Sequence, residues 1–371
     1  MIIGIPKEVC GDERRVALTP AGAYALARSA HSVIVQADAG AGSGFSSEAY
    51  SQAGATIAFS AEEVFARSDL LVKVLPPSVE ESGWLPEERF LFSTLHLGVA
   101  DPKVHEILKR RRTIAAGFEL IEDADGNLPV VTAMSEIAGM LLPQIAGRFL
   151  ETTSGGRGVM LGGIAGIPAS NVVIIGAGTV GSTAARSFLG VGANVTIMDG
   201  DLKRLRDLET SLAKMVNTVL ATPYNIERYV TSADVLVGAV LIHGRKTPHV
   251  VTAAMVRRMR PGSVILDISI DQGGCVETSR PTSLSDPVFS LHGVTHYCVP
   301  NIPSSVARTA SHALNNVLLS FVETIADEGA TAFRDSPTLR RGVYLYSGHC
   351  THEGLAKLMN WEHSNIDALA V

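Results

Sequence analysis

The chain has few cysteines, and none of them are paired in the sequence. Four occur in 371 residues, and Cys10, Cys275, Cys298 and Cys350 are far apart, with no C-x-x-C motif. Disulfide frameworks and zinc sites both need cysteines at close, repeated spacings. The pattern argues against both and fits the reduced thiols of a cytoplasmic protein, so we expect no metal.

Positive charge is scarce as well. Lys and Arg number 31 against 37 Asp and Glu, which leaves a net charge of −6. Such a chain repels nucleic acid and anionic membrane surfaces, so we expect neither as a partner. The one basic cluster, residues 109–112, fits the last turn of a helix, where cations complement the helix dipole.

Long uncharged apolar runs are also absent from the sequence. No stretch of about 18 residues is both apolar and free of charge, so we expect no membrane-spanning helix. The chain opens with a short apolar segment, Ile2–Pro6, and Lys7 and Glu8 follow it at once. This opening does not have the form of a signal peptide.

Short apolar runs alternate with helical patterns along the chain. The expected strands cover residues 2–6, 32–36, 70–74, 90–93 and 113–117 in a first set, and 172–175, 195–198, 235–238, 264–267 and 295–298 in a second. Alternation of this kind predicts parallel sheets covered by helices. We therefore expect an α/β fold with two doubly wound, Rossmann-like domains.

One of these apolar runs ends in a glycine pattern that binds dinucleotides. The pattern G-x-G-x-x-G is formed by Gly176, Gly178 and Gly181. The first glycine allows a tight turn, the second lets a pyrophosphate approach the backbone, and the third lets the next helix pack closely. The phosphates then meet free amides at the start of that helix, at Thr179 and Val180.

An acidic residue completes this unit. The next apolar run, 194–198, ends in Asp199. An acid at this place accepts hydrogen bonds from the adenosine ribose hydroxyls and repels the 2′-phosphate of NADP. Strand, helix, second strand and terminal acid together predict NAD as the cofactor.

Two long helical patterns divide the chain. Residues 134–150 form an apolar helix with no strand on either side, and residues 305–328 form a second long pattern. We expect the first to cross between two domains and the second to return. The predicted domains are a discontinuous substrate domain, 1–130 plus 306–371, and an NAD-binding domain, 131–305, with the active site in the cleft between them.

Six further motifs occur in a fixed order outside the glycine pattern. They are Asp12–Pro20, Lys73–Val74, Leu95–Leu97, Met134–Gly139, Asp267–Cys275 and Tyr297–Pro303. Together they resemble the alanine dehydrogenase family, which includes the NAD-binding part of proton-translocating transhydrogenase. The resemblance extends from Gly4 to about Glu353. It implies reversible oxidative deamination of L-alanine to pyruvate and ammonia, with NAD as hydride acceptor, in a homo-hexamer.

An amino-acid substrate has a carboxylate that the protein must hold. The guanidinium group of Arg15 can bind this carboxylate through two hydrogen bonds, and the ammonium group of Lys73 adds a positive charge. Position alone favours a surface ion pair for Arg15 and leaves Lys73 free to reach solvent from its strand end. The resemblance implies instead that both bind the substrate, and that Asn301 closes the pocket.

Two residues are candidates for proton transfer. A histidine such as His96 can accept and return a proton near neutral pH, and it follows a strand where α/β proteins place ligands. The resemblance implies that His96 is the acid–base group and that Asp271 orients or deprotonates the attacking water. The alternatives are a histidine bonded to a loop carbonyl and an aspartate that stabilises a turn.

The resemblance also implies further contacts with the cofactor. Ser135 resembles the residue that contacts the diphosphate, and Met134, Leu241 and Val299 resemble apolar packing around the nicotinamide. Arg204 fits two interpretations equally, a side chain over the adenine and a solvated helix residue.

The sequence departs from the family in three places. Residues 74–77 read Val-Leu-Pro-Pro where the family has Lys-Glu-Pro, and Thr94 stands where an aromatic is common. The segment 344–354 resembles the family's Thr-His-Glu-Gly end with altered residues before it. Its two histidines, His349 and His352, have no accompanying carboxylates, so helix capping and packing are favoured over a metal.

Two other functions compete with the dehydrogenase. One is a transhydrogenase-like subunit that passes hydride between nicotinamides, and the other is a non-catalytic NAD-binding sensor. A transhydrogenase does not need the small-acid pocket of Arg15, Lys73, His96 and Asp271. The retention of every reactive residue argues against a sensor.

Overall fold

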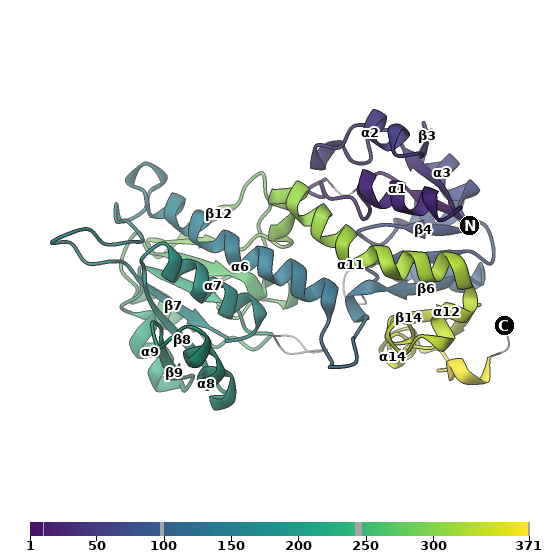
Figure 1. Cartoon of the computed structure of the whole chain (residues 1–371). Coiled ribbons are helices and arrows are strands. Elements are labelled where there is room, and N and C mark those ends of the chain that lie inside the picture. The colour runs from purple at the N-terminus through teal and green to yellow at the C-terminus, as the bar shows by residue number, and fades with distance from the viewer. Residues whose placement is uncertain (10, 97–99, 242–246, 370–371) are drawn as a thin grey trace. The chain divides into compact units, whose positions relative to one another are not determined.

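A computed structural model of the chain describes residues 1–9, 11–96, 100–241 and 247–369. Cys10 and Leu97 lie outside these residues. The chain divides into two compact units. Unit 1 contains Met1–Met134 and Ser304–Val371, and unit 2 contains Ser135–Pro303. Each unit has its own sheet (Figure 1).

The sheet of unit 1 has eight strands in the order β15-β14-β6-β5-β4-β1-β2-β3. They are β1 (Ile2–Ile5), β2 (Ser32–Gln36), β3 (Thr56–Ala58), β4 (Leu70–Val72), β5 (Phe90–Ser93), β6 (Ile114–Gly117), β14 (Val343–Tyr346) and β15 (His349–Cys350). The first six are parallel. Five of them were predicted as strands of a parallel sheet, and β3 was not predicted. β14 runs antiparallel to β6, and β15 runs antiparallel to β14. The prediction of a fully parallel sheet is therefore wrong for β14 and β15. The two-residue turn at Ser347 and Gly348 joins these two strands, and so short a turn can join only antiparallel strands.

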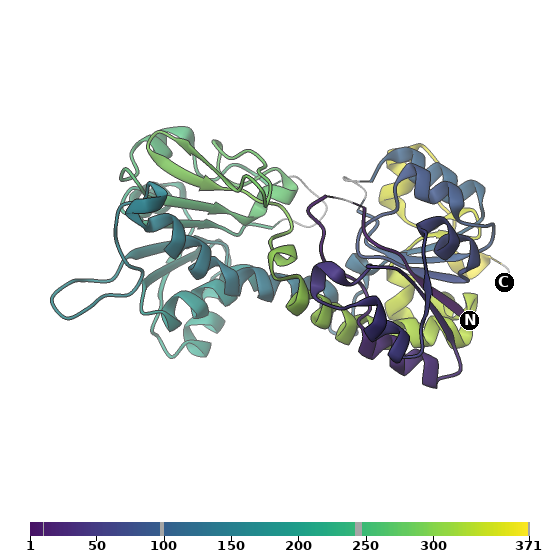
Figure 2. The same ribbon diagram turned by 90° about the horizontal axis from the view of Figure 1, so that it is seen from above.

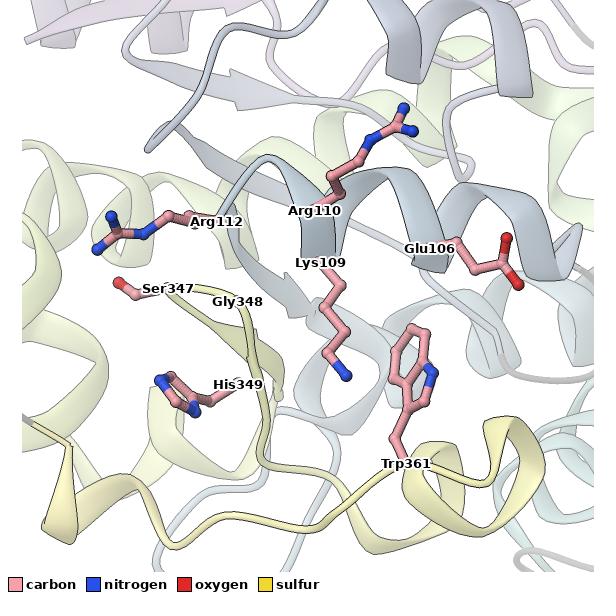
Figure 3. A pocket seen from close by; sticks show the side chains of 8 residues that line it. All are labelled: Glu106, Lys109, Arg110, Arg112, Ser347, Gly348, His349 and Trp361. Carbon is pink, nitrogen blue, oxygen red and sulfur yellow. The ribbon is translucent and has the colours of Figure 1, made fainter.

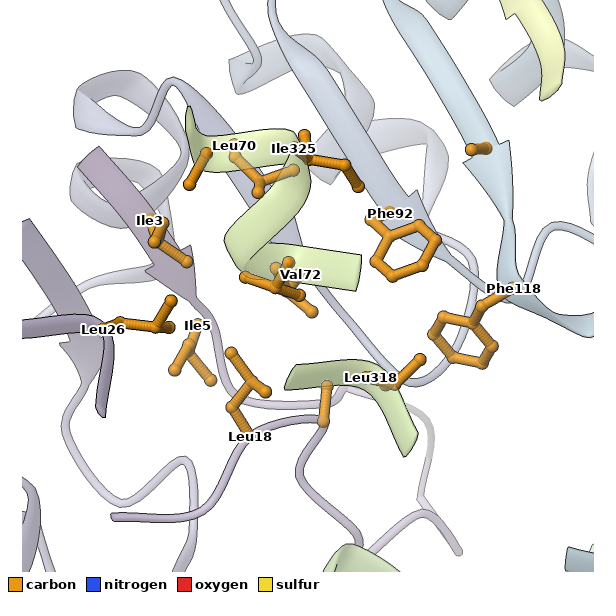
Figure 4. Packing of buried hydrophobic residues seen from close by; sticks show 14 of the residues in the cluster. Ile3, Ile5, Leu18, Leu26, Leu70, Val72, Phe92, Phe118, Leu318 and Ile325 are labelled. Atoms are coloured by element: carbon orange, nitrogen blue, oxygen red, sulfur yellow. The ribbon is translucent and has the colours of Figure 1, made fainter. Parts of the chain in front are cut away.

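Helices cover both faces of this sheet. One face carries α1 (Pro20–Arg28), α2 (Ser47–Gln52), α11 (Ala307–Glu328), α12 (Ala330–Asp335) and α13 (Pro337–Arg341), and the other carries α3 (Ala61–Arg67), α4 (Val79–Trp84), α5 (Pro102–Arg110) and α14 (Glu353–Met359). Successive strand residues feed alternate cores: Leu70 and Val72 pack on the first face, and Leu71 packs on the second. Figure 4 shows the first core.

Helix α11 anchors the segment that follows β1. Its Ser311 Oγ accepts a hydrogen bond from the Val16 amide at 2.9 Å. Its Asn315 Oδ1 accepts from the amide and the hydroxyl of Thr19, at 3.0 and 3.1 Å. Leu314 and Leu318, on the apolar face of α11, are buried in the first core of unit 1. The helix runs along the sheet of unit 1 (Figure 1 and Figure 2). These contacts fix the backbone that carries Arg15.

The sheet of unit 2 has seven strands in the order β12-β13-β11-β10-β7-β8-β9. They are β7 (Asn171–Ile175), β8 (Asn194–Asp199), β9 (Asn217–Leu220), β10 (Val235–Gly238), β11 (Val264–Asp267), β12 (Val288–Leu291) and β13 (Val294–Tyr297). All are parallel except β12, which pairs antiparallel with β13. The prediction is wrong for β12 because His292 and Gly293, both with positive φ, form a two-residue hairpin turn.

The helices of unit 2 include a long one that begins in unit 1. They are α6 (Pro129–Leu150), α7 (Thr179–Gly190), α8 (Leu202–Ser211), α9 (Pro223–Val230) and α10 (Ala253–Arg257). The shorter helical turns of the whole chain are η1 (Ala41–Ser43), η2 (Phe118–Leu120), η3 (Thr152–Ser154), η4 (Ile268–Gln272), η5 (Ile302–Val306) and η6 (Ile366–Ala368). Helix α6 crosses α7 closely at Gly139, where a Cβ would lie 2.8 Å from the Thr183 Cβ.

By length and composition, α6 is the one described helix that could cross a membrane. The sequence prediction required a run free of charge, and α6 contains Glu136 and Arg148. Its Leu142 and Leu150 are fully buried in the protein. The finding is weak evidence for a membrane span, because the core helices of globular proteins pass the same test.

The packing of α7 on β7 depends on Gly181. A Cβ at this position would lie 1.8 Å from the Gly176 carbonyl oxygen and 3.4 Å from the Ile174 Cγ2. Gly190, in the last turn of the same helix, has no atom within 4 Å of an added Cβ. The two glycines therefore differ in packing within one helix.

We expect Gly181→Ala to lower the stability of unit 2 by about 1–3 kcal/mol or more, because the backbone it meets cannot give way. Gly190→Ala should be neutral or stabilising by up to about 1 kcal/mol, since alanine favours the helix. Hydrogen exchange of the β7 amides in increasing urea measures unit 2 alone. Equal protection in the two variants would show that the close contact carries no energy.

Candidate active site

Charged residues follow four neighbouring strands of unit 1. Glu8 comes after β1, Lys73 after β4, His96 after β5 and Glu119 after β6, and these strands are adjacent in the order β6-β5-β4-β1. The carboxyl ends of parallel strands share one edge of a sheet, which is where α/β proteins bind ligands. The structure therefore brings Lys73 and His96 to one edge, together with two acids that do not stand out in the sequence.

Lys73 is buried, with 1% of its surface exposed. Its Nζ lies 2.8 Å from Glu81 Oε1 and 3.4 Å from Glu8 Oε2. Burial alone would lower the pKa of Lys73, but the charges of the two carboxylates outweigh it and raise the pKa. The ammonium therefore stays charged, and the alternative of a lysine that reaches solvent is wrong.

The two acids also hold backbone. Glu8 Oε1 accepts from the Val74 amide at 2.7 Å, and Glu81 forms a capping box with Ser78 at the start of α4. Burial raises the pKa of Glu8, against the opposing charge of Lys73. The sequence signal for Glu81 is its spacing from Ser78, which is the Ser-x-x-Glu pattern of a helix start.

Arg15 is buried as well, with 7% of its surface exposed, and its guanidinium group already makes hydrogen bonds within the protein. Its Nε and Nη2 donate to Glu13 at 2.8 and 2.6 Å, and Nη1 donates to Met134 Sδ at 3.4 Å. The ion pair of the alternative interpretation therefore exists, with Glu13 as the partner, but it is buried and not on the surface. A ligand carboxylate would meet the Nη1–Nη2 edge, and Met134 contacts this guanidinium within unit 1.

The His96 loop is held by Glu119. This buried carboxylate accepts from the Leu95 amide at 3.2 Å and from the His96 amide at 3.0 Å. Tyr344, on β14, donates its hydroxyl to the same carboxylate at 2.8 Å. The His96 side chain is exposed. Within the part of the chain that the structure describes, no loop carbonyl binds its imidazole.

The glycine turn of unit 2 has the backbone that a dinucleotide site needs. Gly176 has a φ of 107°, and a Cβ there would lie 2.2 Å from the Ala239 carbonyl oxygen. A Cβ at Gly178, the N-cap of α7, would meet no atom within 4 Å. Asp199 Oδ2 accepts from the Ala177 amide at 2.7 Å, so the acid also braces the turn.

Arg204 lies close to Asp199. Its Nη1 is 4.0 Å from Asp199 Oδ2 and its Nε is 3.9 Å from Asp201 Oδ2, with more than half of the side chain exposed. The structure thus places Arg204 at the acid that ends β8. The two interpretations, a side chain over the adenine and a solvated helix residue, stay predictions.

The loop after β11 carries Asp271 within η4. Its conformation depends on the buried Asp267, which accepts from the amides of Ser269, Cys275 and Val276 at 3.0–3.2 Å. Asp271 is exposed. The remaining predicted residues of unit 2 are an intermediate Ser135, an exposed Leu241, a buried Val299 and Asn301 with a φ of 55°.

Comparison with known proteins matches both halves of the chain. The model of the alanine dehydrogenase/PNT N-terminal domain matches residues 4–138, and that of the C-terminal domain matches residues 143–353. The chain belongs to the alanine dehydrogenase/PNT family.

Relatives in this family match over nearly their whole length. The chain is 41% identical to the alanine dehydrogenase of Staphylococcus haemolyticus, covering 99% of this chain and 98% of the relative. It is 41% identical to alanine dehydrogenase 2 of Staphylococcus aureus, covering 99% of each. A solved L-alanine dehydrogenase superposes with a TM-score of 0.93 at 40% identity over 97% of this chain and 99% of the other. A transhydrogenase from Sinorhizobium meliloti, with a TM-score of 0.79 at 22% identity over 95% and 99%, shares the fold.

This member of the alanine dehydrogenase/PNT family differs from the usual pattern close to the site. Val74 and Thr94 are both buried, and the Thr94 amide donates to the Val74 carbonyl at 3.2 Å. Val74 and Thr94, which both depart from the family pattern, therefore lie side by side at the carboxyl ends of β4 and β5. Val74 directly follows Lys73, and Thr94 comes two residues before His96. His352 caps α14 by accepting from the Leu355 amide, as predicted. Among the described residues, no group of three or more His, Cys, Asp or Glu could hold a metal.

A separate cavity of about 580 Å³ lies at the end of α5 (Figure 3). It is lined by Glu106, Lys109, Arg110, Arg112, Ser347, Gly348, His349 and Trp361. Lys109 and Arg110 are in the last turn of α5, as predicted for the basic cluster, whereas Arg111 is the C-cap and Arg112 lies beyond the helix. Lys109 Nζ lies 4.2 Å from the centre of the Trp361 ring. Because α5 ends where the chain re-enters β6, this cavity is at the opposite sheet edge from His96.

We expect Glu81→Gln to lower the stability of unit 1 by roughly 2–4 kcal/mol at pH 7, since it leaves a buried ammonium with one carboxylate. The raised pKa of Lys73 stabilises the fold below the lysine's unfolded pKa, and this contribution is lost as pH rises through the folded pKa. The variant lowers that folded pKa, so its alkaline loss of stability should begin at lower pH. Both tryptophans, Trp84 and Trp361, are in unit 1, so their fluorescence in urea reports this unit.

The control is Glu63→Gln, which breaks an exposed pair with Arg67 on α3. It should cost less than about 0.5 kcal/mol. If the two variants unfold at the same urea concentration and the same alkaline pH, Glu81 does not compensate the charge of Lys73.

Proposed function

We propose that the chain catalyses the NAD-dependent, reversible oxidative deamination of L-alanine to pyruvate and ammonia. Its sequence identity of 41% to alanine dehydrogenases, over nearly their full length, supports this activity. The structural observation that carries it is the buried, charged Lys73 on the same sheet edge as the exposed His96. A fixed cation beside a titratable base suits a small substrate that has a carboxylate and loses protons.

Unit 1 is the substrate domain in this proposal. The Nη1–Nη2 edge of Arg15 and the Lys73 ammonium bind the substrate carboxylate, which fixes C2. His96 accepts a proton from the reacting nitrogen or oxygen and returns it. Asp271, from unit 2, steers the water that attacks the imine, and Asn301 closes the pocket.

Unit 2 is the NAD-binding domain, and its residues fit the cofactor. The open face at Gly178 and the amides of Thr179 and Val180 at the start of α7 suit the diphosphate, with Ser135 as a further contact. Asp199 would bind the ribose, Arg204 the adenine, and Leu241 and Val299 would pack against the nicotinamide. A bound nicotinamide would supply the hydride acceptor for C2.

We propose that the enzyme is a cytoplasmic homo-hexamer, as the family resemblance implies. An exposed apolar segment before β7 supports self-association. Met160, Ile164 and Ile167 are each more than half exposed, and the segment extends away from the sheet of unit 2 (Figure 1 and Figure 2). Apolar groups of this kind on one protruding segment mark protein interfaces.

The direct test is reduction of NAD by the purified protein with a panel of L-amino acids. L-Alanine should give the highest kcat/KM, and pyruvate with ammonia should oxidise NADH. Absence of either reaction would contradict the dehydrogenase. Hydride exchange between two nicotinamides without any amino acid would favour the transhydrogenase alternative instead.

Asp199 should make the enzyme prefer NAD. We expect Asp199→Ala to lower the ratio of kcat/KM with NAD to kcat/KM with NADP, because the carboxylate that repels the 2′-phosphate is lost. Asp199→Asn is the control, because it keeps an acceptor for the Ala177 amide while it removes the charge. If the wild-type enzyme uses both cofactors equally, the assigned role of Asp199 is wrong.

His96→Ala and Asp271→Asn should each lower kcat by at least about 10²-fold, the lower end for a general acid or base. Affinity for NADH should change little, because neither residue is assigned to the dinucleotide. The double variant should lose less than the product of the two effects, since residues of one proton relay fail together. Steady-state rates beside an NADH titration test this, and full activity in either single variant removes that residue from the mechanism.

A further inference from the structure

Tyr344 connects the C-terminal part of the chain to the His96 loop. It lies on β14, 2% exposed, and its hydroxyl donates to Glu119 Oε1 at 2.8 Å across 225 residues of sequence. The same carboxylate accepts from the amides of Leu95 and His96. One buried acid thus receives a donor from β14 and two donors from the loop that presents the candidate acid–base residue.

The tyrosine ring is held from several sides. It stacks with His352, with ring centres 4.6 Å apart, and with His105, with ring centres 6.5 Å apart. A Cβ at Gly117 would lie 2.5 Å from the Tyr344 Cε2 and 2.7 Å from either oxygen of Glu119. Only a glycine at 117 leaves room for ring and carboxylate together. The hydroxyl therefore has one well-defined position.

The charge of Glu119 needs these donors. A buried carboxylate is costly unless hydrogen bonds replace the water it loses. Burial, reinforced by the negative charge of Glu119, raises the pKa of Tyr344 far above its usual value. The hydroxyl thus keeps its proton and remains a donor over the whole working pH range of an enzyme.

We propose that Tyr344 is a positioning residue for the dehydrogenase reaction: its hydroxyl fixes the Glu119 carboxylate, and the carboxylate fixes the backbone that aims His96. The inference rests on the proposed acid–base role of His96. Loss of the hydroxyl leaves Glu119 with backbone donors alone, so the carboxylate turns and the loop loosens. Displacement of a catalytic group by about 1 Å is enough to slow a reaction greatly.

The test is Tyr344→Phe, which removes the hydroxyl and keeps the stacked ring. We expect kcat with L-alanine to fall roughly 10- to 100-fold, as for a lost hydrogen bond to a charged group. NADH affinity and the KM for NAD should stay at wild-type values. The control is Tyr346→Phe, which removes a second buried hydroxyl from the same strand, one that donates to the Ala330 carbonyl at 3.3 Å. It should leave kcat unchanged, although both variants lose some thermal stability.

Glu119→Gln removes the charge and one of the two acceptor oxygens at the other end of this bridge, and it completes a double-mutant cycle. Tyr344→Phe should cost less than about two-fold in the Glu119→Gln background, because the hydroxyl acts through the carboxylate. Equal kcat in Tyr344→Phe and Tyr346→Phe, or an additive cycle, overturns the proposal. His96→Ala in the same assay separates the acid–base role of His96 from the positioning role of Tyr344. If His96→Ala stays fully active, the proposed role of His96 is wrong. If His96→Ala is inactive and Tyr344→Phe is fully active, only the positioning role of Tyr344 is rejected.

Discussion

The buried ammonium of Lys73 is the constraint around which unit 1 is organised. An ammonium taken out of water is tolerated only with close negative partners, and Glu8 and Glu81 supply them from the end of β1 and from α4. The three groups join segments far apart in the sequence at one edge of the sheet. Burial raises the pKa of Glu8, and the charge of Lys73 opposes this shift.

Carboxylates that are buried or nearly buried support the loops that carry the candidate site residues. Glu13 orients Arg15, Glu119 orients the His96 loop, Asp199 braces the glycine turn, and Asp267 shapes the loop of Asp271. Each accepts backbone amides that have no partner in a strand or helix. An acceptor with two oxygens satisfies several such amides at once, which makes a carboxylate an efficient support for irregular backbone.

The regular parts of the fold followed from the sequence, because apolar runs alternating with helical patterns leave few alternatives to a parallel sheet. The α/β class was confirmed, and strands such as 32–36, 90–93 and 235–238 have the predicted bounds. The antiparallel strands β12, β14 and β15 were missed. They are short and joined by tight turns, so no helix separates them in the pattern.

The glycine turn and Asp199 could be placed from the sequence alone, since strand, turn, helix and acid are consecutive and their geometry is set by local backbone preferences. The surroundings of Lys73 and His96 could not. Acidic residues are common in loops, and nothing local tells Glu8 or Glu119 from its neighbours. Their partners are chosen by the order in which the strands pair, and that order is decided by the packing of the whole unit.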